Sequence, residues 1–275
     1  MNALFRFRSA APKAPRHVAS RALDVALPVL FGALVIFLWE AKAFHALLDV
    51  KVLQLPVPTR IAGVFAENLP KIASDALVTL GTAARGLAIG SAIGFLVAVA
   101  ATFFPRWGYG SLTMISAFNA IPVVALSPIM NVWFASPSAA KTAVVSVVCT
   151  VAMAVNAYRG LNDVKPFSVD LMRSYAASGP TVFFGLRLPN SVPYVFTAIR
   201  INVASAMIGA IVSEYFSQAS NGLGYGIRNR LSTGQFPLGW AYIIGASAVG
   251  ILLYAFASAL ESLASGKRKD LRGVA

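Results

Sequence analysis

Few residues in this sequence are of the types that perform catalysis or bind metals. The chain has two histidines, His17 and His45, and one cysteine, Cys149. The histidines are far apart and flank an apolar segment, so they predict neither a metal pair nor a proton relay. Cys149 lies inside another apolar segment, where a lone cysteine predicts packing and cannot form an internal disulfide. The sequence therefore predicts no catalytic site and no metal site.

Glycine-rich segments are the other candidates for chemistry, because glycine loops can bind phosphates. Gly222, Gly224 and Gly226 form a G-x-G-x-G string, but no strand is predicted before it, as a dinucleotide-binding fold requires. The sequence contains no G-x-x-x-x-G-K-[ST] loop, and Gly266-Lys267 lacks both the upstream Gly and the following Ser or Thr. We expect no nucleotide site, no cofactor and no enzyme activity in this chain, and we interpret the glycine string as a turn near an external gate.

Polar side chains within or near apolar segments are candidates for a transport pathway or a gate. They are Asn119, Asn131, Asn156, Asn202 and Glu214. A polar group inside a bilayer needs a partner or a water-filled cavity, so each asparagine either lines a pathway or forms an interhelical hydrogen bond. Glu214 is expected at an external membrane interface, either as part of a gate or as an ordinary interfacial carboxylate.

The composition indicates that the elements positioning these residues lie in a membrane. Of the 275 residues, 57% are hydrophobic and 12% are charged, and the mean hydropathy is +0.71. Soluble domains have about 25% charged residues. The formal net charge of +13 could suggest nucleic-acid binding, but the basic residues cluster at both ends and between apolar segments. Anionic lipid and membrane topology explain that distribution, so we predict an all-α membrane protein and no nucleic-acid partner.

Apolar segments predict about six transmembrane helices. They are residues 25–39, 86–104, a kinked helix within the uncharged interval 107–140, and residues 142–158, 194–213 and 236–260. Pro122 and Pro128 predict the kink, and a short external turn is expected at residues 136–138. Trp133, beside Phe134, is typical of an interfacial aromatic belt.

Two arginines belong to these segments. Arg85 lies in the amphipathic stretch before the second span and must either snorkel to the interface or find a partner. Arg200 lies within the fifth span and can snorkel to the cytoplasmic face. An ion- or proton-driven carrier would need a titratable residue at membrane depth, and arginine stays charged, so neither is a suitable proton carrier.

The domain organisation follows from the spans. We assign residues 1–22 to a basic cytoplasmic tail, residues 23–265 to a transmembrane domain, and residues 266–275 to a second basic cytoplasmic tail. Six spans put both termini on one side, and the positive-inside rule places that side in the cytoplasm. A cleavable signal peptide is the competing interpretation of the start, because Ala41-Lys42-Ala43 resembles a cleavage site. The sequence leaves open whether the first span is retained.

Residues 159–187, between the fourth and fifth spans, predict two short helices rather than a simple connector. Ser168 can cap the first helix, and Asp170 lies in its first turn, where the helix dipole favours an anion. Gly179 and Pro180 then turn the chain. The second helix, residues 181–186, is apolar enough to pack under the membrane bundle.

The loop also carries a recognisable pattern. Asp170-Leu-Met-Arg-Ser-Tyr-Ala-Ala-Ser-Gly-Pro-Thr-Val-Phe-Phe-Gly-Leu-Arg-Leu188-Pro189 resembles the EAA loop of binding-protein-dependent ABC importer permeases. Segments 121–134, 189–200, 208–214 and 222–225 are similar to the nitrate, sulfonate and taurine group of that family. The resemblance covers roughly residues 77–260 and implies the type I ABC importer permease fold.

Some positions depart from the family pattern. Asp170 stands where the family usually has Glu, which keeps the acidic charge. Leu171 and Met172 replace two alanines. Ala176 replaces the usual Gly, and we expect the loss of this helix-ending glycine to leave the local turn to Gly179.

The resemblance implies that the loop docks into a separate ATPase subunit and passes its motion to the membrane helices. The coupling residues would be Asp170, Leu171, Arg173, Ser174, Tyr175, Ala176, Ala177, Ser178 and Gly179. It also implies ABC ATPase subunits that bind ATP-Mg, a second permease subunit in a homo- or heterodimer, a periplasmic or lipid-anchored solute-binding protein, and membrane lipids as partners. The chain would lie in the bacterial inner membrane.

Two matters stay open at this point. An ion- or proton-driven secondary transporter is the alternative function, and an ordinary amphipathic connector is the alternative for the loop. Similarity to the subgroup implies a small solute that is either nitrate, a sulfonate or taurine, or an aromatic heterocycle such as a pyrimidine precursor or riboflavin. The residue types at positions 171–175, Leu-Met-Arg-Ser-Tyr, favour the heterocycles.

Overall fold

The computed structural model describes residues 18–117, 120–217 and 220–269. Every regular element among these residues is a helix, so the all-α prediction is confirmed. The chain divides into two compact units, one ending at Arg60 and the other beginning at Ile61.

The first unit contains α1 (Val18–Glu40), α2 (Ala43–Leu48) and the start of α3 (Pro58–Glu67). The apolar part of α1, Ala26–Glu40, is shorter than the spans of the second unit and contains Pro28. Glu40 accepts hydrogen bonds from the backbone and the hydroxyl of Thr59, at 3.0 and 2.7 Å. His45 hydrogen-bonds the carbonyl of Leu55 at 2.6 Å, which gives this histidine a structural role.

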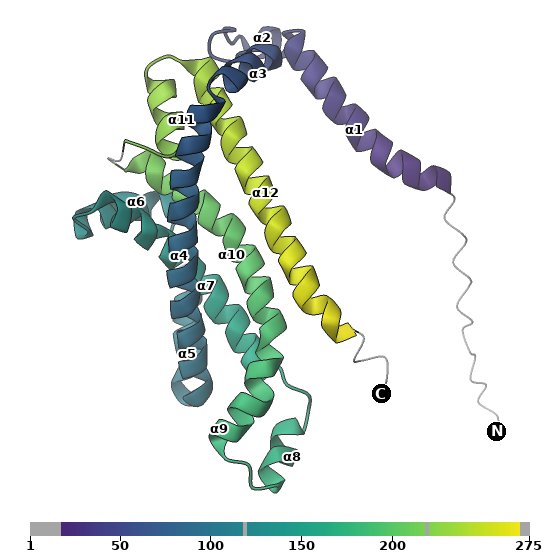
Figure 1. The fold of residues 1–275 in the computed structure, drawn as a ribbon, viewed down its shortest axis with the longest axis vertical. Helices are drawn as coiled ribbons and strands as arrows, with labels where there is room; N and C mark the ends of the chain where they lie inside the picture. The colour runs from purple at the N-terminus through teal and green to yellow at the C-terminus, as the bar shows by residue number, and fades with distance from the viewer. Residues whose placement is uncertain (1–17, 118–119, 218–219, 270–275) are drawn as a thin grey trace, which may run out of the picture. The chain divides into compact units, whose positions relative to one another are not determined.

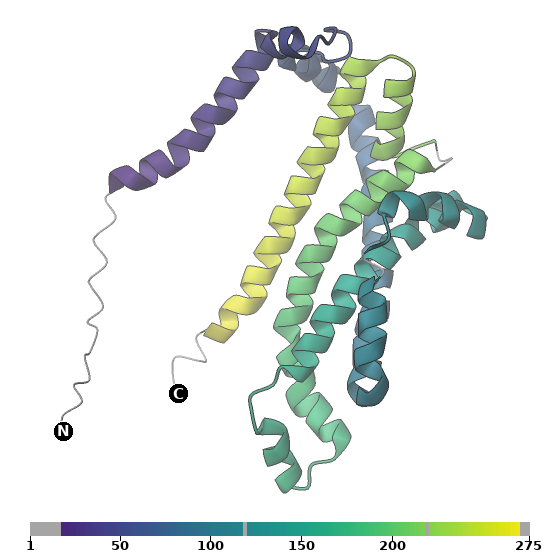
Figure 2. The same ribbon diagram turned by 180° about the vertical axis from the view of Figure 1, so that it is seen from behind.

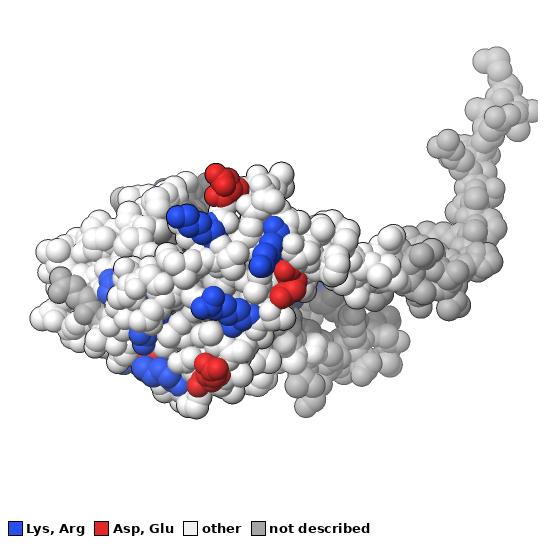
Figure 3. Space-filling model, turned by 90° about the horizontal axis from the view of Figure 1, so that it is seen from above, with Lys and Arg blue, Asp and Glu red and all other residues white. Residues whose placement is uncertain are grey.

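The second unit is built on four long apolar helices, each long enough to cross a bilayer. They are α4 (Leu69–Phe103), α7 (Pro137–Asn162), α10 (Leu188–Phe216) and α12 (Phe236–Lys269). Figures 1 and 2 show these helices packed lengthwise. We call the end where α7 finishes and α10 begins the loop end, and the opposite end the far end. On the face drawn in Figure 3, charged side chains of both signs are scattered among uncharged ones.

The seam between α4 and α7 is lined by small residues. A Cβ atom added to Gly86 would lie 2.3 Å from the Cβ of Val145, and one added to Gly90 would lie 2.3 Å from the carbonyl oxygen of Ser146. Gly94 is equally close to α7. Glycines spaced four residues apart let two membrane helices approach to backbone contact, where dispersion rather than the hydrophobic effect holds them together.

The third predicted span is not one kinked helix. The chain forms α5 (Pro105–Ala117) and α6 (Val123–Trp133), and α6 is apolar but too short to span alone. Pro122 stands directly before α6 as its N-cap residue, with extended backbone at φ −61° and ψ 126°. Residues 137 and 138, predicted in a turn, are instead the first turn of α7, where proline loses no hydrogen bond.

The second loop helix is also not a separate element. A short α9 (Gly179–Val182) passes through a π-helical turn (Phe183–Arg187) straight into α10. The backbone N–H of Leu188 bonds the carbonyl of Phe183 across the wide turn. Phe183 is buried in a core between α4, α7 and α10, so packing at this point draws the segment into one continuous helix.

Candidate functional site

The predicted coupling segment forms α8 (Ser168–Ser174) at the loop end, and α8 buries no residue. Asp170 lies in its first turn, as predicted. Ser168 does not cap the helix. The N-cap is Phe167, in the left-handed region at φ 63°, and its carbonyl accepts from the N–H of Leu171 at 2.8 Å, so the backbone begins the helix without a side-chain cap.

Three large apolar side chains of this segment are exposed, beside the exposed Asp170 and Arg173. Phe167 is 81% exposed, Tyr175 is 80% exposed, and Leu171 is 58% exposed. Large apolar groups clustered on a protruding helix are typical of a surface that another protein covers.

The end of α8 is made by Ala176 and not by Gly179. Ala176 has φ +55°, in the left-handed region that normally favours glycine. Its N–H bonds the carbonyl of Arg173 at 2.9 Å, and the N–H of Ala177 bonds the carbonyl of Met172 at 3.0 Å. These two bonds form a Schellman motif. Gly179 instead begins α9, which Ser178 caps through the N–H of Thr181.

The base of the loop fastens α7 to α10. The amide of Asn190 donates to the carbonyls of Gly160 and Asp163, both at 2.8 Å. Arg187 donates to Asn162 at 2.5 Å, and the hydroxyl of Tyr194 bonds the carboxylate of Asp163. These contacts join α7 and α10 directly on either side of the segment that contains α8.

At the far end, Glu214 is fully buried and joins four helices. Its Oε2 accepts from the hydroxyl of Thr79 on α4 at 2.8 Å and from the N–H of Gly224 on α11 (Leu223–Ser232) at 3.1 Å. Its Oε1 lies 4.0 Å from the Nζ of Lys141 on α7. The N–H of Leu223 donates to Thr79 at 2.9 Å, which closes the network.

A second carboxylate extends this network to α12. Asp75 accepts from the hydroxyl of Tyr242 at 2.8 Å, from Lys71 at 2.8 Å and from the N–H of Gly222 at 3.4 Å. Gly222 has φ +103°, and a Cβ there would lie 2.4 Å from the carboxyl carbon of Glu214. The first glycine of the string therefore lets the backbone approach two carboxylates rather than a phosphate. Only Gly222 makes the predicted turn, because Gly224 and Gly226 lie inside α11.

Glu214, expected at a membrane interface, is fully buried, and its partners were not predicted. Asp75 and Thr79 stand four residues apart on one face of the segment that precedes the predicted second span, which is a signal of a shared polar face. Lys141, the third partner, is buried in α7.

The asparagine candidates do not gather in one place. Asn202 is buried in the core of the bundle and donates to the carbonyl of Cys149 at 2.8 Å, joining α10 to α7. Asn131 and Asn156 each donate to the carbonyl four residues earlier in their own helix. Asn119 lies outside the described residues. Arg200, expected to snorkel, instead pairs with Glu261 of α12 at 2.7 Å.

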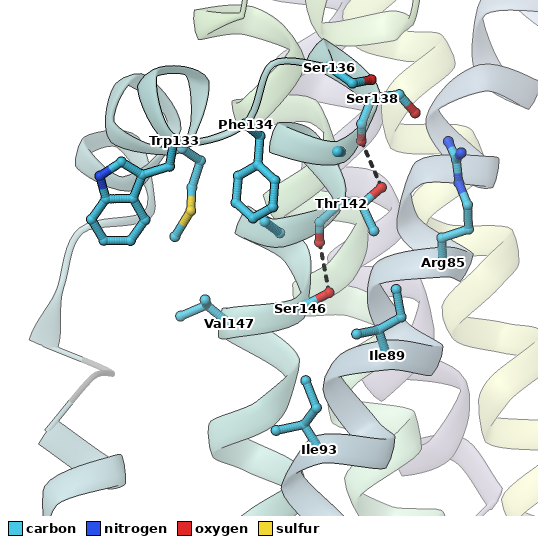
Figure 4. A pocket seen from close by; sticks show the side chains of 13 residues that line it. Arg85, Ile89, Ile93, Trp133, Phe134, Ser136, Ser138, Thr142, Ser146 and Val147 are labelled. Carbon is cyan, nitrogen blue, oxygen red and sulfur yellow. Dashed lines mark hydrogen bonds between the residues drawn. The ribbon is translucent and has the colours of Figure 1, made fainter.

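A cavity of about 670 Å³ lies between α4, α6 and α7 (Figure 4). Apolar side chains from all three helices line most of it, together with Arg85 and hydroxyl groups at the start of α7. Asn131, Asn156 and Asn202 do not line it. Among the described residues, no group of three or more His, Cys, Asp or Glu side chains could hold a metal ion.

Comparisons with known proteins agree with this architecture. Residues 90–265 match the family model described as binding-protein-dependent transport system inner membrane component. The chain is 30% identical to the formylaminopyrimidine transport permease protein ThiX of Halalkalibacterium halodurans, over 88% of this chain and 96% of that protein. It is 25% identical to the riboflavin transport system permease protein RibX of Chloroflexus aurantiacus, over 86% of this chain and 88% of that protein. It is also 30% identical to the putative aliphatic sulfonates transport permease protein SsuC of Escherichia coli, over 44% of this chain and 46% of that protein.

This chain belongs to the binding-protein-dependent inner-membrane component family and is a multi-pass ABC transporter permease subunit for a small solute, with the all-α type I permease fold.

Proposed function

We propose that this chain forms the translocation pathway of an ATP-driven importer and that α8 couples it to a separate ATPase subunit that binds ATP-Mg. The observation that carries the proposal is the exposure of Leu171 on α8 and of Phe167 and Tyr175 at its two ends, in a segment whose flanking helices α7 and α10 are bonded to each other. A rigid helix with an apolar surface can insert into a groove of a partner and follow the movement of that partner.

The continuous helix from Gly179 to Phe216 supports a lever mechanism. Asn190 ties its loop end to α7, while Glu214 ties its far end to α4, α7 and α11. A tilt imposed through α8 would displace Glu214 relative to Thr79 and Lys141 and so open or close the far end. The π-helical turn provides a place for the bend, because such turns interrupt the regular bonding of a helix.

The assembly follows from this role. Two permease subunits, identical or different, would act with two ATPase subunits and an external solute-binding protein, and both termini would lie in the cytoplasm of a bacterial cell. The solute would be either a nitrate-, sulfonate- or taurine-like anion or an aromatic heterocycle such as a pyrimidine precursor or riboflavin. The names of the relatives support both classes.

Co-expression with the ATPase of the same operon tests the coupling. Leu171→Asp and Tyr175→Asp place charges on the proposed docking surface without disturbing the core, so we expect the ATPase to stop co-purifying and ATP-dependent uptake to be lost. Phe104→Asp is the matched control, because Phe104 is an exposed apolar residue at the end of α4, outside α8. Unchanged co-purification of the α8 variants would refute the coupling role. Uptake that follows a proton gradient without ATP would establish the alternative, an ion- or proton-driven secondary transporter.

A further inference from the structure

The cavity between α4, α6 and α7 has the size and lining of a small-molecule site. Binding pockets are commonly about 300–1,000 Å³, mostly apolar, with a few polar groups that orient the ligand. Here Ile89 and Ile93 of α4 face Trp133 and Phe134 at the end of α6, and Arg85 is the one charged residue among the described lining residues. Figure 4 shows Arg85 beside the part of the cavity where Ser136 and Ser138 lie.

Arg85 lies within the depth of the spans. The neighbouring Gly86 packs on α7, where an added Cβ would be 3.2 Å from the carbonyl oxygen of Thr142. Thr142 is in the second turn of α7, so Arg85 is level with the far-end part of a helix that crosses the bilayer. A guanidinium group at this depth is costly unless it faces water or an opposite charge.

No carboxylate among the described residues pairs with Arg85, whereas two other cations of the long helices each have one. Lys141 lies near Glu214, and Arg200 pairs with Glu261. The only hydrogen bond of Arg85 within the described residues runs from its Nε to the carbonyl of Gly81 at 3.0 Å. Its two terminal nitrogens therefore keep donors for a ligand, and a guanidinium presents them in the fork geometry that suits an oxyanion.

The surroundings of Arg85 add to the positive potential. Ser136 and Ser138, which line the cavity, stand at the N-terminus of the 26-residue helix α7, where the helix dipole is positive. Hydroxyl donors and positive charge thus gather at one part of an otherwise apolar pocket.

We propose that Arg85 binds an oxyanion in this cavity, a sulfonate, carboxylate or phosphate group, and that the transported solute carries this group on an apolar or aromatic body. The proposal rests on the proposed function and narrows its substrate class to anions. An aliphatic sulfonate, the solute in the name of one relative, has this chemistry. A lipid headgroup offers the same oxygens, and the experiment separates the two sources.

The test measures binding to the full-length chain in nanodiscs of neutral phosphatidylcholine, by tryptophan fluorescence, because Trp133 lines the cavity. The probes are 4-methylbenzenesulfonate and its uncharged analogue 4-methylbenzenesulfonamide. We expect Arg85→Gln to weaken binding of the sulfonate about tenfold or more, since a charge-assisted bidentate contact is lost. Arg85→Lys should retain part of the affinity. Arg106→Gln, the same charge change at an exposed position at the start of α5, should leave it unchanged. The sulfonamide should bind all variants alike.

Phosphatidylglycerol in the nanodisc provides the second arm. If it abolishes sulfonate binding to the wild type, the oxyanion at Arg85 is a lipid headgroup and the assignment to the solute is overturned. If sulfonate and sulfonamide bind the wild type equally, or if Arg85→Gln binds the sulfonate like the wild type, the whole proposal is overturned. The measurement needs no ATPase, so a coupling test that refutes the proposed function would leave this result unaffected.

Discussion

Replacing Ala176 with glycine should stabilise the end of α8. Ala176 holds φ +55°, a conformation that costs an L-residue about 1–2 kcal/mol and costs glycine nothing. The greater freedom of glycine in the unfolded loop offsets about 0.5–1 kcal/mol of this gain. The net stabilisation is about 0.5–1 kcal/mol, which corresponds to amide hydrogen exchange that is about two- to fivefold slower across the last turn of α8.

Hydrogen exchange with mass spectrometry on peptides covering residues 168–178 measures this effect. Ala177→Gly is the matched control, because Ala177 donates to Met172 without a positive φ, so glycine there should leave exchange unchanged or accelerate it. Exchange in Ala176→Gly that is unchanged or faster than in the wild type would refute the strain argument. Equal slowing in both variants would refute it as well, since the effect would not depend on the left-handed residue.

Three further perturbations test the packing and the polar contacts. Gly90→Ala should lower the stability of the bundle by about 1–3 kcal/mol in thermal unfolding, because the new methyl group would clash with the carbonyl of Ser146. Gly81→Ala on the same helix is the control, because the new methyl group enters open space there and should leave stability unchanged or raise it. Asn190→Ala should cost about 1–3 kcal/mol and reduce ATP-driven uptake while the ATPase still co-purifies. Asn68→Ala is the control, because it removes only a hydrogen bond to the carbonyl of Val64 in the preceding turn, and it should leave uptake unchanged. If Asn68→Ala reduces uptake as much as Asn190→Ala does, Asn190 does not fasten α7 to α10 in the way proposed. Glu214→Gln should destabilise the protein by about 3 kcal/mol, because Lys141 is left buried without a carboxylate. Adding Lys141→Met to this variant should recover part of the lost stability. If the two substitutions instead cause strictly additive losses of stability, the two residues do not interact.

The predicted features that the structure confirms are those decided locally. Apolar length identifies four of the six predicted spans, which are α4, α7, α10 and α12, because a bilayer leaves the backbone no partner except itself and so requires helices. The acidic residue at 170 falls in the first turn of its helix because the dipole acts over one turn only. The loop pattern lies in consecutive residues, so it could be recognised without a fold.

The features that sequence reasoning missed depend on contacts between distant residues. Ser168 was expected to cap α8 and Gly179 to make the turn, but the left-handed residues Phe167 and Ala176 do both, because the loop must leave and rejoin two helices that are already fixed. The third span became α5 and α6 for a similar reason, since α6 packs against α7 and α10.

The sequence alone determined that this chain is a helical membrane protein with a loop that resembles the coupling loop of ABC importer permeases, because hydropathy, charge distribution and a contiguous motif are properties of neighbouring residues. Only the tertiary structure decided which charges meet. Thr79 and Glu214 are 135 residues apart, and Gly222 reaches Asp75 across 147 residues. Such pairs form because close helix packing brings buried polar groups together. No periodicity along the chain indicates which distant residues will be in contact.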